Sequence, residues 1–385
     1  MDTTLEIVSS GDAAATTPVT GDAGSATEPT HAPAPELPAM QILEIADGQA
    51  VCFSNVAPLK PTGNEDSWGA ITVSRQSGLL AVADGLGGHR GGRAASQLVI
   101  DQLSSQAKAL PQSGPLPVLG DAVLIDNEWE PSPLEMQMAI LSAIEETNQE
   151  LIRRGVGSAT TLALVEVQGR AVRTYHVGDS EILVVGQRGR VKGRTVSHSP
   201  VGYARQAGIL NETEAMYHEE RHLVSNVVGI AEMRIEMGPR IELAARDTVL
   251  IASDGLFDNL YEQEIVEIIR KGQLEAGVRQ LAELASSRML LGQGGVPSKA
   301  DDLTIVAFRL NPPVRERKQR GERKRRNEPT PSSTPPVPAQ QRSSEPVAVT
   351  HQDAPSDARP FDAVQLAPHF HRQFPIARVH DLEAH

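Results

Sequence analysis

The chain lacks several features on which other classes of protein depend. It contains one cysteine among 385 residues, which excludes a disulfide framework and a zinc site built from cysteines. Aromatic residues make up only 3% of the chain. No apolar run approaches the roughly 20 residues of a membrane-spanning helix, and the first residues lack the basic and apolar regions of a signal peptide. We therefore expect a cytoplasmic protein without a membrane span.

Positive charge is also scarce. The chain has 36 Lys and Arg against 49 Asp and Glu, a formal net charge of -13. This acidic balance argues against nucleic acid as the main partner. Apolar residues account for 39% of the chain, below the roughly 45–50% of an average globular protein. The shortage of apolar residues predicts that part of the chain is unfolded.

The composition places the unfolded parts at the two ends. Residues 1–40 contain no Lys or Arg and repeat Ala, Thr and Pro, whereas residues 312–385 begin with two prolines and continue through a basic run into a Pro/Ser/Thr stretch. Such segments bury too little apolar surface to offset the entropy lost on ordering. We predict a disordered tail over 1–40, a folded domain over 41–311, and a largely disordered, Pro-rich and basic tail over 312–385.

The middle of the chain shows the patterns of regular structure. Compact runs rich in Val, Ile and Leu predict β-strands, at 78–84, 161–167, 171–177, 181–186, 248–254 and 303–310. Helical spacing of apolar residues predicts helices, at 94–110, 134–154 and 262–291. The strands between residues 161 and 186 follow one another through short turns, which is typical of antiparallel hairpins. Helices grouped apart from antiparallel strands predict an α+β domain built in layers.

Aspartates stand where these predicted strands begin or end. Asp84 and Asp254 each end a strand and are followed by glycine, Asp179 follows a strand, and Asp66 and Asp301 precede one. A single Asp-Gly pair is a common turn signal. Five such acids in one domain would repel one another unless a cation neutralised them. Oxygen ligands without a His or Cys set favour Mg²⁺ or Mn²⁺, and two such ions can act together on a phosphoryl group.

Two other phosphate-related motifs are absent. The segment GGHRGGRA (87–94) has the glycine spacing of a phosphate-binding loop, but Arg93 and Ala94 stand where that loop requires Lys and Ser or Thr. Cys52 is followed six residues later by Pro58 instead of the Arg of a cysteine-dependent phosphatase. We expect Cys52 to pack in the core.

Six motifs occur in an order that resembles one family, the metal-dependent protein serine/threonine phosphatases (type 2C, or PPM) in their bacterial form. They are NEDS (64–67), LLAVADGLGGHRGGRAAS (79–96), GSATTLAL (157–164), HVGDSEILVV (176–185), VLIASDGLFDNL (249–260) and DDLTIVAF (301–308). Residues 197–229 also resemble the mobile flap of that family and the stretch after it. The resemblance implies a four-layer αββα sandwich, in which helices flank two antiparallel β-sheets.

The resemblance also implies which residues bind metal. Asp84 would bridge two ions, and the carbonyl of Gly85 would bind one of them. Asp254 and Asp301 would complete the coordination of the first ion. Asp66 would hold metal-bound water, which makes Asp66 and Asp84 the catalytic acids.

Further positions are less directly implied. Asp179 would support a third, weaker ion, and Asp258 would either assist beside Asp254 or serve only the structure. Family members usually carry an Arg five residues before the first-motif Asp, where this chain has Pro61. We therefore expect Lys60 to attract the substrate phosphate, as a point charge without the paired donors of Arg. His89 would either contact the substrate or serve only the structure, as a capping or packing residue.

The implied activity is hydrolysis of phosphoserine and phosphothreonine on proteins, by direct attack of a hydroxide that bridges two Mn²⁺ or Mg²⁺ ions. The implied partners are phosphorylated proteins, the substrates of a serine/threonine kinase, and the implied state is a monomer. One alternative is a catalytically impaired protein of this fold that binds phosphorylated partners, an idea favoured by the missing Arg. Another is a regulatory phosphatase that acts on a small set of signalling proteins.

Overall fold

Two antiparallel β-sheets lie at the centre of the fold in the computed structural model, which describes residues 7–9, 37–86, 90–110, 129–292 and 295–312. The first sheet has the order β1 (Ile7–Ser9), β4 (Ser67–Thr72), β5 (Ser77–Ala83), β8 (Leu162–Gln168), β9 (Ala171–Val177) and β12 (Glu236–Met237), with β13 (Ile241–Glu242) also paired to β9. The second has the order β11 (Val191–Arg194), β10 (Glu181–Val185), β14 (Thr248–Ala252), β15 (Leu303–Leu310), β3 (Gly48–Asn55) and β2 (Gln41–Ile45). A short separate pair joins β6 (Gly85–Leu86) to β7 (Ala159–Thr160).

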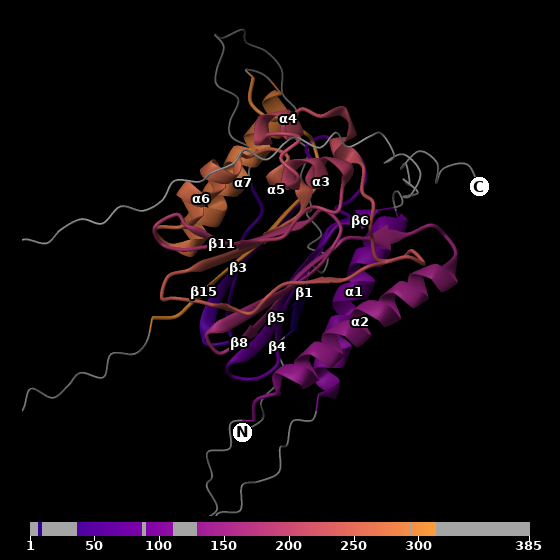
Figure 1. Ribbon diagram of the computed structural model, residues 1–385, viewed down its shortest axis with the longest axis vertical. Helices are drawn as coiled ribbons and strands as arrows, with labels where there is room; N and C mark the ends of the chain where they lie inside the picture. The colour runs from indigo at the N-terminus through magenta and orange to yellow at the C-terminus, as the bar shows by residue number, and fades with distance from the viewer. Residues whose placement is uncertain (1–6, 10–36, 87–89, 111–128, 293–294, 313–385) are drawn as a thin grey trace, which may run out of the picture. The chain divides into compact units, whose positions relative to one another are not determined.

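Helices cover the outer faces of these sheets (Figure 1). The first sheet packs against α1 (Arg90–Ala109) and α2 (Pro133–Arg154). The second packs against α5 (Asp254–Phe257), α6 (Glu262–Ile269) and α7 (Leu274–Leu291). The segment that resembles a flap contains α3 (Pro200–Gln206), α4 (Glu212–Met216) and the 3-10 helix η1 (Glu219–His222). The predicted α+β sandwich of four layers is confirmed.

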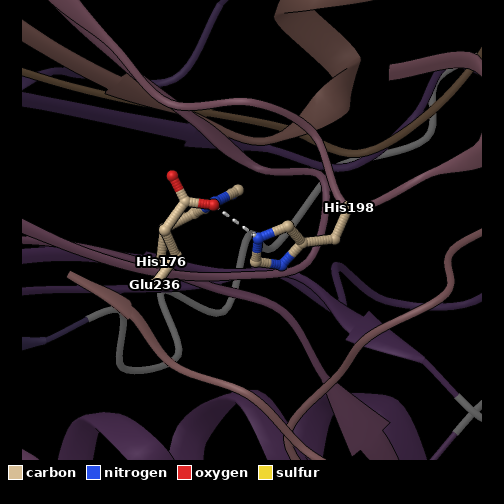
Figure 2. Close-up of side chains that lie close together, drawn as sticks. All are labelled: His176, His198 and Glu236. Carbon is tan, nitrogen blue, oxygen red and sulfur yellow. Dashed lines mark hydrogen bonds and ion pairs between the residues drawn. The ribbon is translucent and has the colours of Figure 1, made fainter. Parts of the chain in front are cut away.

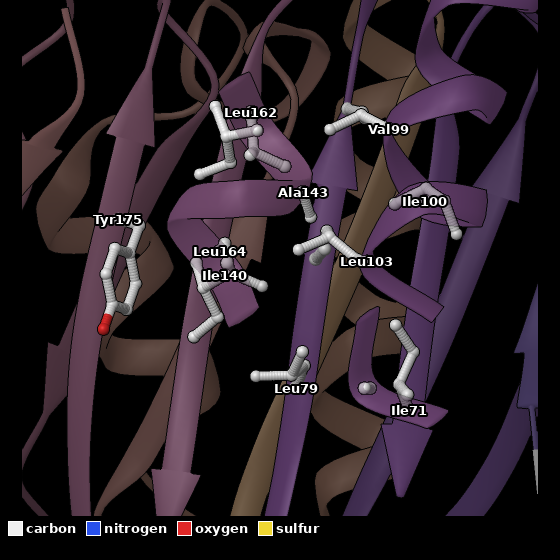
Figure 3. Packing of buried hydrophobic residues seen from close by; sticks show 14 of the residues in the cluster. Ile71, Leu79, Val99, Ile100, Leu103, Ile140, Ala143, Leu162, Leu164 and Tyr175 are labelled. Carbon is white, nitrogen blue, oxygen red and sulfur yellow. The ribbon is translucent and has the colours of Figure 1, made fainter. Parts of the chain in front are cut away.

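Both faces of the central strands are buried, which explains why their sequences are continuous apolar runs. Successive side chains of a strand point to opposite faces of a sheet. In β5, Leu79 packs against α1 and α2 (Figure 3). The next residue, Leu80, packs between the two sheets. In β14, Val249 lies between the sheets and Leu250 packs against the helices on the other side.

The predicted helix over 262–291 is wrong as a single element, because the chain forms α6 and α7 with a turn between them. Gly272 in that turn has a φ of 75°, a conformation that glycine adopts without steric cost. The turn lets Ile265 and Leu274 both face the second sheet. The helical spacing of apolar residues continues through the turn. A prediction from this spacing alone therefore merges the two helices into one.

Two further boundaries differ from the predictions. The strand predicted over 248–254 ends at Ala252, and Asp254 instead begins α5. Ile7–Ser9 forms strand β1 on the edge of β4, although it lies within the predicted disordered tail. The backbone groups of β4 at that edge thereby gain partners. The rest of that tail up to residue 36, the tail from residue 313 and His89 lie outside the described residues. In the described part of the chain, no helix is long and apolar enough to cross a membrane.

Candidate metal centre

The pairing of strands brings the predicted acids to one edge of the sandwich. In the first sheet, Ser67 of β4 is opposite Ala83 of β5. Asp66 directly precedes Ser67 and Asp84 directly follows Ala83, so the two acids lie side by side at the same edge of the sheet. The sequence predicted their position at strand ends, and the register makes those ends neighbours.

The second sheet contributes the remaining acids by the same means. Ala252 of β14 is opposite Glu181 of β10 and Ile305 of β15. The chain segments beyond these three residues carry Asp254, Asp179 and Asp301, which therefore lie at a common edge. All five predicted acids converge there.

Their mutual repulsion is visible in the electrostatics. Burial raises the pKa of Asp84 well above its usual value, and the nearby carboxylates raise it further; in order of effect these are Asp66, Asp254, Asp301 and Asp179. Burial is also the main cause that raises the pKa of Asp66 to about 8 and that of Asp301 to about 7. A buried site with this much negative charge favours a bound cation.

Unpaired oxygens indicate where a cation fits. Ser253 donates from Oγ to Oδ2 of Asp66 at 2.8 Å, which orients that carboxylate. Oδ1 of Asp66 and Oδ1 of Asp254 are buried without a hydrogen-bond partner among the described residues. Unsatisfied buried oxygens are costly unless another group binds them. Oxygen donors of this kind suit Mg²⁺ or Mn²⁺, so the residues present fit the divalent ions that the family resemblance implies.

Gly85 lies against the start of α1 at a distance that only glycines allow. A Cβ on Gly85 would be 2.2 Å from the carbonyl oxygen of Gly92, and a Cβ on Gly92 would be 2.6 Å from the carbonyl oxygen of Gly85. The glycines of the GGHRGG segment therefore include one that packs α1 onto the acidic edge. This packing accounts for Gly92, one glycine of the pattern that resembled a phosphate-binding loop.

Lys60 is bound by two carboxylates. Its Nζ lies 2.7 Å from Oδ2 of Asp302 and 2.9 Å from Oε2 of Glu65. Asp302 also accepts hydrogen bonds of 2.7 Å from the backbone nitrogens of Ala57 and Glu65. The sequence pattern missed this role of Asp302, which ties the loop carrying Lys60 and Asp66 to the start of β15. A phosphate contact by Lys60 stays a prediction.

Asp302→Asn is expected to destabilise the protein by about 3 kcal/mol. The buried carboxylate accepts hydrogen bonds from two backbone nitrogens and from Lys60. The amide of Asn has one oxygen and a nitrogen that cannot accept, so at least one of these buried donors loses its partner. Urea unfolding, followed by circular dichroism, would measure the change. Asp47→Asn is a matched control, since the exposed Asp47 pairs with Arg75 at 3.5 Å and such pairs contribute little. Equal stability of the two variants would contradict the structural role of Asp302.

A second cluster of ligand-type side chains lies beside the turn that carries Asp179. His176, His198 and Glu236 offer ligand atoms within 4.8 Å of one another (Figure 2). Nε2 of His176 lies 2.8 Å from the carbonyl oxygen of Ser180, and Nε2 of His198 lies 3.1 Å from Oε2 of Glu236.

The hydrogen bonds of His198 argue against a metal in this cluster. Its Nδ1 accepts from the backbone nitrogen of Gly178 at 3.1 Å and from Nδ2 of Asn226 at 2.9 Å. Asn226 is fixed in orientation, because it bonds both the nitrogen and the oxygen of Arg234. We therefore assign the proton of His198 to Nε2, where it donates to Glu236. The cluster joins the start of the flap segment to the Asp179 turn, since the backbone nitrogen of His198 also donates to Gly178.

Comparison with known proteins identifies the family of the chain. A family model described as Protein phosphatase 2C matches residues 60–286, and the chain belongs to that family. It is 29% identical over 243 residues to the serine/threonine protein phosphatase PstP of Mycobacterium tuberculosis, covering 63% of this chain and 41% of PstP. It therefore spans less than half the length of that relative.

Other relatives are matched over nearly their whole length. The serine/threonine phosphatase stp of Listeria innocua is 27% identical over 255 residues, which cover 64% of this chain and 90% of that protein. The crystal structure of the PPM Ser-Thr phosphatase MsPP from Mycobacterium smegmatis, in complex with cacodylate, aligns with a TM-score of 0.52 and 26% identity over 68% of this chain and 98% of MsPP. The predicted family, a bacterial PPM-type phosphatase, is confirmed.

Proposed function

We propose that this protein is a metal-dependent protein serine/threonine phosphatase, which hydrolyses phosphoserine and phosphothreonine on other proteins. The observation that carries the proposal is the convergence of five acids, with unpaired buried oxygens on Asp66 and Asp254, in a chain of the 2C family. The names of its relatives support the same activity.

Two Mg²⁺ or Mn²⁺ ions at this edge, with a third beside Asp179, would lower the pKa of a water and neutralise charge on the phosphoryl oxygens. Asp84 is the central residue for holding them, since four other carboxylates act on it electrostatically. Asp254 and Asp301 approach from the second sheet, and the carbonyl of Gly85 lies beside Asp84. Ser253 orients Asp66 through Oδ2. Oδ1 of Asp66, which has no hydrogen-bond partner among the described residues, would bind a metal ion or the water that the ion holds.

A groove next to the acids gives a substrate its approach. Its lining includes Asp179, Asp254 and Asp258 together with residues of the flap segment. The flap residues include Ser199, Gly202, Arg205, Met216 and Arg221. A phosphorylated peptide segment lying in this groove would present its phosphate at the acidic edge. We propose that the substrates are phosphorylated proteins, that they are made by a serine/threonine kinase, and that the phosphatase acts as a monomer in the cytoplasm.

The alternative of a catalytically impaired phosphopeptide-binding protein is not favoured. It was suggested by Pro61 in place of an Arg. Every acid that the resemblance assigns to the metals is present at one edge, and a protein that only binds phosphopeptides has no need of that much buried, mutually repelling charge.

The activity is tested by hydrolysis of a phosphothreonine peptide while Mn²⁺ is titrated in. We expect turnover that rises with Mn²⁺, disappears on addition of EDTA, and falls on the order of a hundredfold in Asp254→Asn at a fixed Mn²⁺ concentration, because a metal-binding oxygen is lost. Asp101→Asn, at an exposed position of α1, should behave as wild type. Phosphopeptide binding without turnover at millimolar Mn²⁺ would overturn the proposal and favour the binding protein.

A further inference from the structure

One lysine lies inside the acidic edge itself. The ammonium of Lys299 contacts three of its carboxylates: Asp254, Asp258 at 2.9 Å and Asp301 at 3.2 Å. Lys299 is only 18% exposed. Two of the three partners, Asp254 and Asp301, are acids that would bind the first metal ion. The same oxygens are therefore shared between an ammonium of this chain and a divalent cation.

The backbone of Lys299 is fixed, which directs the side chain to this place. Its nitrogen donates to Oδ1 of Asn259 at 2.8 Å, and its carbonyl oxygen accepts from Nδ2 of the same residue at 2.8 Å. Asn259 is fully buried and also donates to the carbonyl oxygen of Gly255 at 2.9 Å. The loop before β15 is thus pinned to α5, the helix that begins at Asp254. Only the flexible four-carbon stem of Lys299 is free to move its charge.

Electrostatics favour a strong interaction. Burial disfavours an isolated ammonium, but the three carboxylates around Lys299, those of Asp254, Asp258 and Asp301, offset this cost by attraction at contact distance. An ammonium and a divalent cation on the same carboxylates repel each other strongly in a partly buried site. One must leave when the other binds.

We propose that Lys299 is a built-in competitor for the divalent cation, a tethered positive charge that stabilises the acidic edge and that an ion must displace from Asp254 and Asp301. Displacement makes ion binding weaker than the carboxylates alone would allow. The metal concentration at which the site fills is then set by this lysine. The proposal rests on the proposed function, because it assumes that these acids bind metal.

Isothermal calorimetry with Mn²⁺ alone, without substrate, tests the competition. Lys299→Met preserves the length of the stem and removes the charge, so we expect Mn²⁺ to bind at least tenfold more tightly than to wild type. Lys299→Arg, which keeps the charge, should stay within a few-fold of wild type. Lys192→Met is a matched control, since Lys192 pairs with the buried Asp247 away from this edge, and its Mn²⁺ affinity should be unchanged.

Thermal unfolding gives a second readout that does not depend on activity. In EDTA, Lys299→Met should unfold at a lower temperature than wild type, because three carboxylates lose their cation. Saturating Mn²⁺ should raise its unfolding temperature by more than it raises that of wild type. Equal Mn²⁺ affinity and an equal shift in wild type and Lys299→Met would overturn the competitor role while leaving the metal site intact. Absence of Mn²⁺ binding by both proteins would overturn the metal site and the competitor role together.

Discussion

Asp84→Asn is expected to abolish metal-dependent hydrolysis and, in EDTA, to make the protein more stable than wild type. Asp84 is the acid on which four neighbouring carboxylates act, so its loss removes the ligand at the centre of the site. Metal ions supply several kcal/mol of charge stabilisation in such reactions. Since about 4 kcal/mol corresponds to roughly a thousandfold in rate, we expect turnover to fall by about that factor or more.

The expected gain in stability follows from the direction of the pKa shift. The pKa of Asp84 is raised in the folded protein, first by burial and then by its neighbours. A carboxyl group of this kind destabilises the fold as the pH rises above its ordinary pKa, because the unfolded chain ionises more readily. At neutral pH the uncharged Asn removes that cost. Functional sites commonly trade stability for activity in this way.

The two effects are measured separately. Turnover of a phosphothreonine peptide is followed at saturating Mn²⁺, and urea unfolding is followed in EDTA. Asp101→Asn on the exposed face of α1 is the control for loss of one negative charge. Retained turnover in Asp84→Asn would contradict the role of Asp84 as the central metal-binding residue. A loss of stability in EDTA would show that the carboxylate is needed for folding instead.

Gly255→Ala is expected to destabilise the protein by about 3 kcal/mol or more, the upper range for overpacking a buried position. A Cβ at Gly255 would lie 2.1 Å from the carbonyl oxygen of Asp302 and 3.3 Å from Cα of Leu303. Both are backbone atoms at the start of β15 and have no rotamer with which to move aside. The strand would have to shift, and with it Asp301 and the loop that Asp302 ties down.

Gly63→Ala is the matched control, because its Cβ would approach only a side-chain nitrogen of Arg93, at 3.7 Å. Its stability should stay within about 0.5 kcal/mol of wild type. Urea unfolding monitors the fold, and Mn²⁺ calorimetry on the folded fraction monitors the site. If Gly255→Ala were as stable as Gly63→Ala, the close contact between α5 and β15 would not constrain the acidic edge.

Much of this fold could be predicted from local patterns. The runs at 78–84 and 303–310 are apolar on both faces because the strands are buried on both faces, and that property is present in the residues themselves. The helix predicted over 134–154 was found as α2, where Ser132 forms a capping box and Gly155 ends the helix in a left-handed conformation. Such signals require only neighbours in sequence.

The boundary between α6 and α7 shows where local patterns end. Apolar spacing passes through the turn at Gly272, and the two helices separate because both pack on the same sheet. The candidate site divides in a similar way. Asp66 and Asp84 could be recognised from their positions at strand ends. Asp302 also precedes a predicted strand, but the sequence gave no sign of its contact with Lys60. Lys299 gave no signal that distinguished a site residue from an ordinary surface charge.

The sequence by itself determined the class of fold, the family and the acids of the candidate site. Apolar periodicity and each motif are properties of short stretches of chain, and the order of the motifs can be read along the sequence. Only the tertiary structure decided which charges meet. Lys60 and Asp302 are 242 residues apart in sequence, and Lys299 reaches Asp254 across 45. These contacts depend on the register of two sheets and on the packing of α5 against β15. Electrostatic interactions depend on distance in space, and sequence separation does not determine that distance.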